Sequence, residues 1–234
     1  MNNLSKIKST LNYAIITICL ASVLYMVLTL VWTTSYSVFV EDDFTIIDMI
    51  EGMDHNVLSY LRLAGKNIAE TYMGWQGTYL GCFLYVILNP VGQAGLVQER
   101  WVMSLNSSLF FISLLLFLVV SLKKLGLKLE AVSAVIISVI VFSLCGYQTY
   151  PEIFFWFTGA VVYSFPMSIL LITLSIFLLD SDNIATTSIS SVLGIISMGG
   201  ALLISGAGCY TALLVLVYEY FTQTSHKDLH RKPS

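Results

Sequence analysis

Long apolar stretches, separated by short polar or turn segments, recur along almost the whole chain. A hydrocarbon core about 30 Å thick needs about 20 apolar residues in each helix that crosses it. The pattern therefore predicts membrane-spanning helices at about 11–34, 101–122, 129–147, 160–180, 187–205 and 208–222. The first stretch is longer than the apolar part of a secretion signal, which has about 7–15 residues, so we interpret it as a retained span.

A further apolar stretch, 76–97, is interrupted by Asn89-Pro90. Because cytoplasmic loops are enriched in lysine and arginine, the basic residues indicate whether this stretch crosses the membrane. If it crossed, the lysines at 123–128 would face the side opposite the basic N-terminus. We therefore interpret 76–97 as a re-entrant or interfacial helix, which leaves both termini, including the tail 226–234, in the cytoplasm.

This topology places residues 35–100 outside as one long loop and 147–155 as a short one. The two loops hold most of the acidic residues but few basic ones, namely Glu41, Asp42, Asp43, Asp48, Glu51, Asp54, Glu70, Glu99 and Glu152 against Arg62, Lys66 and Arg100. Apolar residues from Phe44 to Leu61 recur at roughly helical spacing, which predicts an amphipathic helix along the membrane surface. The predicted fold is all-α, a polytopic transmembrane helical bundle in one domain, 1–225.

Composition supports a membrane protein and excludes several classes of function. The chain is 57% hydrophobic and only 11% charged, whereas soluble domains carry about 25% charged residues. No basic stripe suitable for nucleic acid is present, and the four cysteines lack the C-x-x-C spacing of a metal or redox site. Within the stretch 101–122, Asn106 is a candidate for an interhelical hydrogen bond.

An acidic triplet, Glu41-Asp42-Asp43, directly follows the first predicted span. A carboxylate here could take a proton from an attacking hydroxyl, as a general base does. Alternatively, Asp42 and Asp43 could hold a divalent cation such as Mg²⁺, Mn²⁺ or Ca²⁺ through oxygen ligands. A third interpretation is that the triplet is only a solvated segment that ends a helix.

Aromatic residues cluster at two other places on the same predicted membrane face. Trp75 and Tyr79 lie near the end of the long loop, and Trp156 and Tyr163 lie at the start of the span 160–180. Such residues are typical of the aromatic belt at a membrane interface. Aromatic rings also stack on the apolar faces of sugars, so the same residues could line a carbohydrate site.

Three motifs occur in order on this face: D-D-F at 42–44, Y-x-x-W-x-G-T-Y at 72–79, and P-E-x-x-x-W-x-x-G-A-x-x-Y-x-x-P at 151–166. With them, residues 1–210 resemble the N-terminal part of bacterial GT-C-fold membrane glycosyltransferases, the group often labelled glucosyltransferase-domain or DUF6056-like proteins. The resemblance implies transfer of a sugar from a polyprenyl-phosphate carrier to a cell-envelope acceptor on the extracytoplasmic face. Members of that group continue with further spans, so the chain is expected to match a truncated GT-C architecture.

The resemblance also implies an acidic catalytic base in the first outer loop, a position matched by Asp42 and Asp43. We expect Asp43 to be the base and Asp42 its partner or an acceptor ligand. Glu152 could orient the acceptor or could simply be a carboxylate at a helix start.

The leaving phosphate needs a cation, and arginine binds phosphate in a bidentate way. Arg100 is therefore our first candidate and Arg62 our second, with Lys66 as the remaining basic residue of the loop. Alternatively, Arg100 pairs with Glu99 or extends towards lipid headgroups.

A non-enzymatic class of function remains an alternative. The chain could be a membrane accessory subunit, or one half of a split glycosyltransferase that needs a second membrane chain. A transporter is disfavoured because the sequence shows neither an internal repeat nor a cluster of charges at the middle of a span.

Overall fold

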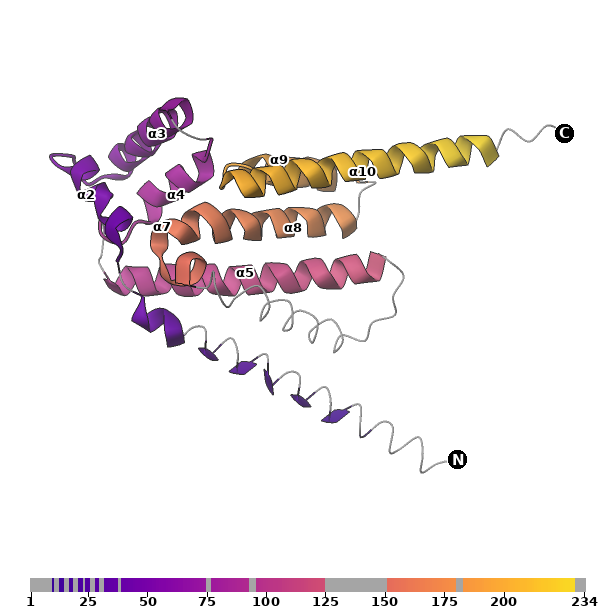
Figure 1. The fold of residues 1–234 in the computed structure, drawn as a ribbon, viewed down its shortest axis with the longest axis horizontal. Helices are drawn as coiled ribbons and strands as arrows, with labels where there is room; N and C mark the ends of the chain where they lie inside the picture. The colour runs from indigo at the N-terminus through magenta and orange to yellow at the C-terminus, as the bar shows by residue number, and fades with distance from the viewer. Residues whose placement is uncertain are drawn as a thin grey trace.

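The computed structural model describes residues 32–37, 39–74, 77–92, 96–124, 151–179 and 183–229, together with scattered positions between residues 10 and 29. Regular structure in these residues is helical, which confirms the all-α class for the described part of the chain. In Figure 1, α8 (Phe165–Leu179) lies between α5 (Leu96–Lys124) on one side and α9 (Ile184–Ser197) with α10 (Leu202–Leu229) on the other. Helices α2 (Thr45–Ile50), α3 (Val57–Gly74) and α4 (Tyr79–Leu88) gather at one end of this layer.

Two described helical stretches are long and apolar enough to cross a membrane, Gln98–Lys124 and Phe157–Leu179. They contain the predicted spans 101–122 and most of 160–180, respectively. At 1.5 Å per residue their 27 and 23 residues rise about 40 and 35 Å. The predicted span 129–147 and most of 11–34 lie outside the described residues.

The boundary between the last two helices differs from the predicted one. The predicted spans 187–205 and 208–222 would separate near residue 206, but α10 continues through that point and the break lies at 198–201. There the carbonyl oxygen of Gly199 accepts hydrogen bonds from the backbone N–H groups of Leu80 (2.8 Å) and Gly81 (3.2 Å), both in α4. The break is therefore fixed by a tertiary contact with a helix more than 100 residues earlier.

Alanine in place of Gly199 is expected to destabilise the protein by about 1–3 kcal/mol, because the added carbon would overpack the junction. Its Cβ would lie 2.7 Å from the backbone nitrogen of Leu80 and would also collide with the ring of Tyr79. Gly206→Ala is the matched control, since a Cβ at Gly206 meets nothing within 4 Å. Thermal unfolding in detergent would measure both variants, and equal unfolding midpoints would contradict this account of the break.

The amphipathic helix predicted from Phe44 to Leu61 is in fact two helices. Helix α2 ends at Ile50, the chain turns through Gly52 with φ +72°, and α3 begins at Val57. Glycine suits this turn because residues with a side chain rarely adopt positive φ. Asn56 then caps α3, since its side-chain oxygen accepts from Ser59 N at 2.9 Å.

Helix α4 occupies the middle of the stretch 76–97 that we expected to be interfacial or re-entrant. Its ten residues rise about 15 Å, half the thickness of a hydrocarbon core. Val86 on one side of α4 packs in a hydrophobic core with residues of the neighbouring elements, namely Ile46, Ala64, Met103 and Phe157. This core fixes helices α2, α3 and α4 against the start of α5.

A buried polar contact ties α5 to the chain before α8. The side-chain amide of Asn106 donates to the carbonyl oxygen of Ile153 (3.1 Å), and the hydroxyl of Ser164 lies 2.7 Å from the Asn106 side-chain oxygen. The interhelical hydrogen bond predicted for Asn106 is thus confirmed. Ser164 ends a π-helical turn, Ala160–Ser164, in which the Val162 carbonyl oxygen accepts from Ala201 N at 3.0 Å.

Candidate functional site

Asp42 and Asp43 lie in a short 3₁₀ turn, η2 (Glu41–Phe44). A 3₁₀ helix has three residues per turn, so neighbouring side chains point about 120° apart. The two carboxylates accordingly meet different surroundings: Asp43 is 0% exposed, whereas Asp42 is exposed and lines a cavity. The structure therefore separates two residues that the sequence could not distinguish.

Asp43 acts as an anchor between the first loop and the helical stretch Phe157–Leu179. Its Oδ1 accepts hydrogen bonds from the backbone N–H (3.0 Å) and the hydroxyl (2.6 Å) of Thr158, and its Oδ2 accepts from Val40 N (3.0 Å). Thr158 is the second residue of that stretch, where unpaired N–H groups and the helix dipole favour a negative charge. The Asp43 carboxylate is thus occupied by donors from its own chain.

The segment around Asp42 is held by its main chain. The phenol of Tyr85 donates to the carbonyl oxygen of Asp42 (2.7 Å), and the hydroxyl of Thr45 lies 2.6 Å from the phenol oxygen. Burial raises the pKa of Tyr85, with a smaller contribution from the nearby carboxylates, while the bond to Thr45 lowers it. Tyr85 therefore remains a proton donor that fixes Asp42 at the cavity.

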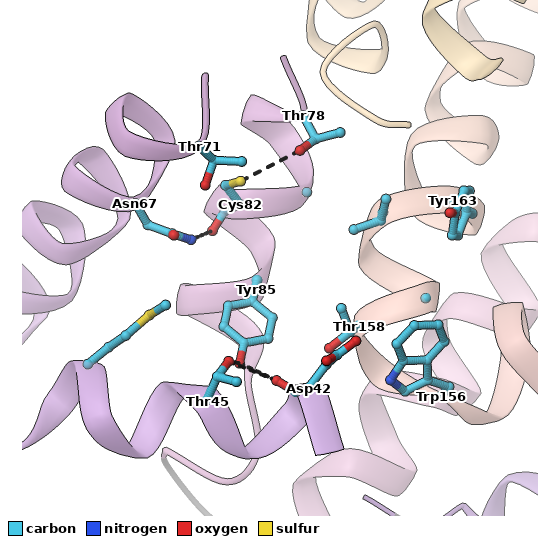
Figure 2. A pocket seen from close by; sticks show the side chains of 14 residues that line it. Asp42, Thr45, Asn67, Thr71, Thr78, Cys82, Tyr85, Trp156, Thr158 and Tyr163 are labelled. Atoms are coloured by element: carbon cyan, nitrogen blue, oxygen red, sulfur yellow. Dashed lines mark hydrogen bonds between the residues drawn. The ribbon is translucent and has the colours of Figure 1, made fainter. Parts of the chain in front are cut away.

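The cavity has a volume of about 330 Å³ and lies between η2, α3, α4 and the start of the stretch Phe157–Leu179. Figure 2 shows Asp42, Thr158 and Trp156 at one end of it and Asn67, Thr71, Thr78 and Cys82 at the other. Its lining is rich in hydroxyl, amide and aromatic groups, with Asp42 as the acidic residue. No lysine or arginine is found among the described residues that line it.

The structure brings together some of the predicted site residues and not others. Asp42, Trp156 and Tyr163 line the cavity. Tyr79 does not, because its hydroxyl donates to the carbonyl oxygen of Ile195 and ties α4 to α9. Trp75 and the side chain of Glu152 lie outside the described residues.

The three candidate phosphate ligands lie away from this lining. Arg62 and Lys66 are exposed on α3, and Lys66 is 3.7 Å from Glu70 in an exposed ion pair. Arg100 is exposed on the first turn of α5. None of the three side chains is among the described residues that line the cavity.

Several lining residues were missed at the level of sequence, notably Asn67, Thr71, Thr78, Cys82 and Tyr85. A signal for them exists in their spacing. Asn67 and Thr71 are four residues apart on α3 and so lie on one face of that helix, and Thr78, just before α4, is four residues from Cys82 in the first turn of α4. Polar residues at this spacing indicate a shared polar surface.

Asp42 and Asp43 do not form a shared cation site, because the oxygens of Asp43 already accept three hydrogen bonds. Among the described residues, no group of three or more histidine, cysteine, aspartate or glutamate side chains could hold a metal ion. We therefore assign no metal to this pair and derive no step of a reaction through one.

A second buried carboxyl group, that of Glu99, interacts electrostatically with Asp43. Glu99, in the first turn of α5 before the apolar stretch begins at Trp101, is 0% exposed, and within the described part of the chain neither of its side-chain oxygens has a hydrogen-bond partner. Burial, reinforced by the negative charge of Asp43, raises the pKa of Glu99 from 4.5 to about 7, although Arg100 opposes the shift.

Scans of the chain against protein-family models, curated proteins and solved structures found no match.

Proposed function

We propose that the chain is a multi-pass membrane glycosyltransferase that moves a sugar from a polyprenyl-phosphate carrier to a cell-envelope acceptor on the extracytoplasmic face. The observation that carries this proposal is the position of Asp42, whose side chain lines a cavity rich in hydroxyl, amide and aromatic groups. A carboxylate placed among such groups suits proton removal from a sugar hydroxyl. The roles of the two aspartates are exchanged relative to our expectation, with Asp42 as the base and Asp43 as its anchor.

The membrane orientation follows from the two ends of α5. Helices α2 to α4, which contribute to the cavity lining, lie at the end of α5 where this helix begins (Figure 1), whereas Lys123 and Lys124 occupy its last turn. Lysines flanking a span favour the cytoplasmic side, so the cavity would open outside. The exposed side chains of Val57, Leu58 and Leu61 on α3 would then contact the membrane interface.

The lining indicates which part of the substrates the cavity holds. Without a lysine or arginine among its described residues, the cavity suits an uncharged sugar ring better than a phosphate. Trp156 and Tyr163 offer aromatic surface to a sugar, and the threonine hydroxyls and the Asn67 amide offer hydrogen bonds to its hydroxyls. The carrier phosphate would lie outside the cavity, towards the membrane surface.

In the proposed reaction, Asp42 takes the proton of the acceptor hydroxyl. The acceptor oxygen forms a bond to the anomeric carbon of the donor sugar while the bond from that carbon to the phosphate oxygen breaks. The electron pair of the broken bond leaves with the polyprenyl phosphate. Anchoring by Thr158 and Tyr85 fixes the turn that carries Asp42, and such positioning lowers the barrier of a reaction between two bound partners.

The experiment that tests the proposal is sugar transfer in membranes that contain this chain, with a panel of polyprenyl-phosphate sugars as donors. Transfer above that of membranes lacking the chain, with at least one donor, supports the glycosyltransferase. Absence of transfer with every donor, in a sample that unfolds cooperatively, would reject it in favour of an accessory subunit or one half of a split enzyme.

A further inference from the structure

Glu99 is a buried acid that the proposed reaction does not use. Its carboxyl is fully buried, and neither oxygen has a hydrogen-bond partner among the residues that the structure describes. An ionised carboxylate in that situation is strongly disfavoured, since a buried charge without partners loses its hydration and gains nothing in return. A proton on the carboxyl removes the charge and leaves only the smaller cost of burying a neutral polar group without a partner.

The charged groups around Glu99 make the ionised form still less favourable. Asp43 of η2 repels a second negative charge, and its own carboxylate is fully buried and accepts hydrogen bonds from Thr158 and Val40. Tyr85 of α4, the other titratable group next to Asp43, is a neutral phenol. Arg100 on α5 attracts the charge of Glu99, but its side chain is exposed and therefore screened.

Asp43 is the point at which Glu99 can affect the cavity. The carboxylate of Asp43 joins η2 to Thr158, and both Asp42 and Thr158 line the cavity. A second negative charge near Asp43 would repel its carboxylate and weaken its hold on Thr158, because charges in a buried environment are poorly screened. The geometry of Asp42 relative to the opposite wall would then be lost.

We propose that Glu99 is a positioning residue that acts through Asp43, holding the turn that carries Asp42 against Thr158 only while Glu99 is an uncharged carboxylic acid. The part of this inference that concerns transfer rests on the proposed function. The part that concerns the protonation state and stability does not.

The dependence on pH follows from the pKa of about 7 in the folded protein against 4.5 in the unfolded chain. Between these values the folded state binds more protons than the unfolded state, so stability falls as pH rises from about 4.5 to about 7. Inside the folded protein, Glu99 loses its proton around pH 7. Between pH 6 and pH 8 its protonated fraction falls about tenfold.

The first experiment detects the proton on Glu99 directly and needs no activity. Infrared spectra of the wild-type protein in detergent at pH 6 should show the C=O band of a protonated carboxyl, and this band should disappear on titration to pH 8. Glu99→Gln should lack the band, whereas the matched control Glu70→Gln should retain it, because Glu70 is exposed on α3. A band of equal size in wild type and Glu99→Gln would overturn the proposal.

The second experiment measures the consequence for folding and transfer. Glutamine keeps the shape of the uncharged acid, so the unfolding midpoint of Glu99→Gln should fall less between pH 5 and pH 8 than that of wild type and of Glu70→Gln. The wild-type transfer rate should fall about tenfold from pH 6 to pH 8, against less than twofold for Glu99→Gln. Parallel pH profiles of wild type and Glu99→Gln would overturn the positioning role.

These measurements separate the two proposals. If no transfer is found but the infrared band and the unfolding profiles behave as expected, the proposed function is rejected, and the protonated state of Glu99 is still supported. If transfer is found but its pH profile is unchanged in Glu99→Gln, the positioning role of Glu99 is rejected, and the proposed glycosyltransferase function is still supported.

Discussion

Asparagine in place of Asp42 is expected to lower the rate of sugar transfer by about 10²–10⁴-fold, the usual contribution of a general base. The amide is nearly the same size as the carboxylate but cannot take a proton from the acceptor hydroxyl. Folding should be unaffected, because the contacts that hold this segment use the Asp42 carbonyl oxygen, which is unchanged in the variant. Initial rates of transfer and thermal unfolding in detergent would be measured on the same preparation.

The matched control is Glu41→Gln. Glu41 is the neighbouring exposed carboxylate of the same turn and does not line the cavity. Its neutralisation should change the transfer rate by less than about twofold, since an exposed charge at this distance is largely screened. A Glu41 variant as inactive as the Asp42 variant, or an Asp42 variant of full activity, would remove Asp42 from the role of base.

The same substitution one residue later is expected to act on folding instead. Asp43→Asn should destabilise the protein by about 2–4 kcal/mol, because an amide accepts through only one oxygen and its NH₂ group would face the N–H and O–H donors of Val40 or Thr158. Relief of the repulsion with Glu99 offsets only part of this cost. Thermal unfolding of Asp43→Asn against Asp42→Asn compares two isosteric changes in adjacent residues.

A double-mutant cycle with Thr158→Val would identify the contact responsible. Valine removes the hydroxyl that donates to Asp43 but keeps the backbone N–H, so the two substitutions should be less than additive. Full additivity would show that the anchor does not depend on this hydroxyl. An Asp43 variant as stable as wild type but without transfer would restore Asp43 as the base.

The helical class and the two long helices could be predicted because they depend on local properties of the chain. An uninterrupted apolar stretch such as 101–122 leaves few alternatives to a helix in lipid. The break at 198–201 could not be placed in the same way. In the sequence, Gly206 and Gly208 are as suitable for ending a helix as Gly199 is. Only the contact of Gly199 with α4 places the break at 198–201.

Only part of the aromatic lining of the cavity could be predicted, since Tyr79 does not line it and Tyr85 was missed, and the different roles of Asp42 and Asp43 could not be predicted. Trp156 and Tyr163 stood out as aromatic residues at the start of a span, and both line the cavity. Asp42 and Asp43 are chemically identical, and their roles differ because Thr158 lies against one of them from 115 residues away. No local pattern encodes such a contact.

The junction at Gly199 consists of main-chain hydrogen bonds, from Leu80 N and Gly81 N to Gly199 O and from Ala201 N to Val162 O. Every residue except proline has the groups that make these bonds, so evolution can exchange Leu80, Val162 or Ala201 for other small or apolar residues without losing the joint. The adjacent glycines are different, since a Cβ at Gly200 would lie 2.5 Å from Pro166 and one at Gly199 would strike α4. In a distantly related protein, we therefore expect the glycine pair between two apolar stretches to be retained, even where the neighbouring residues have changed.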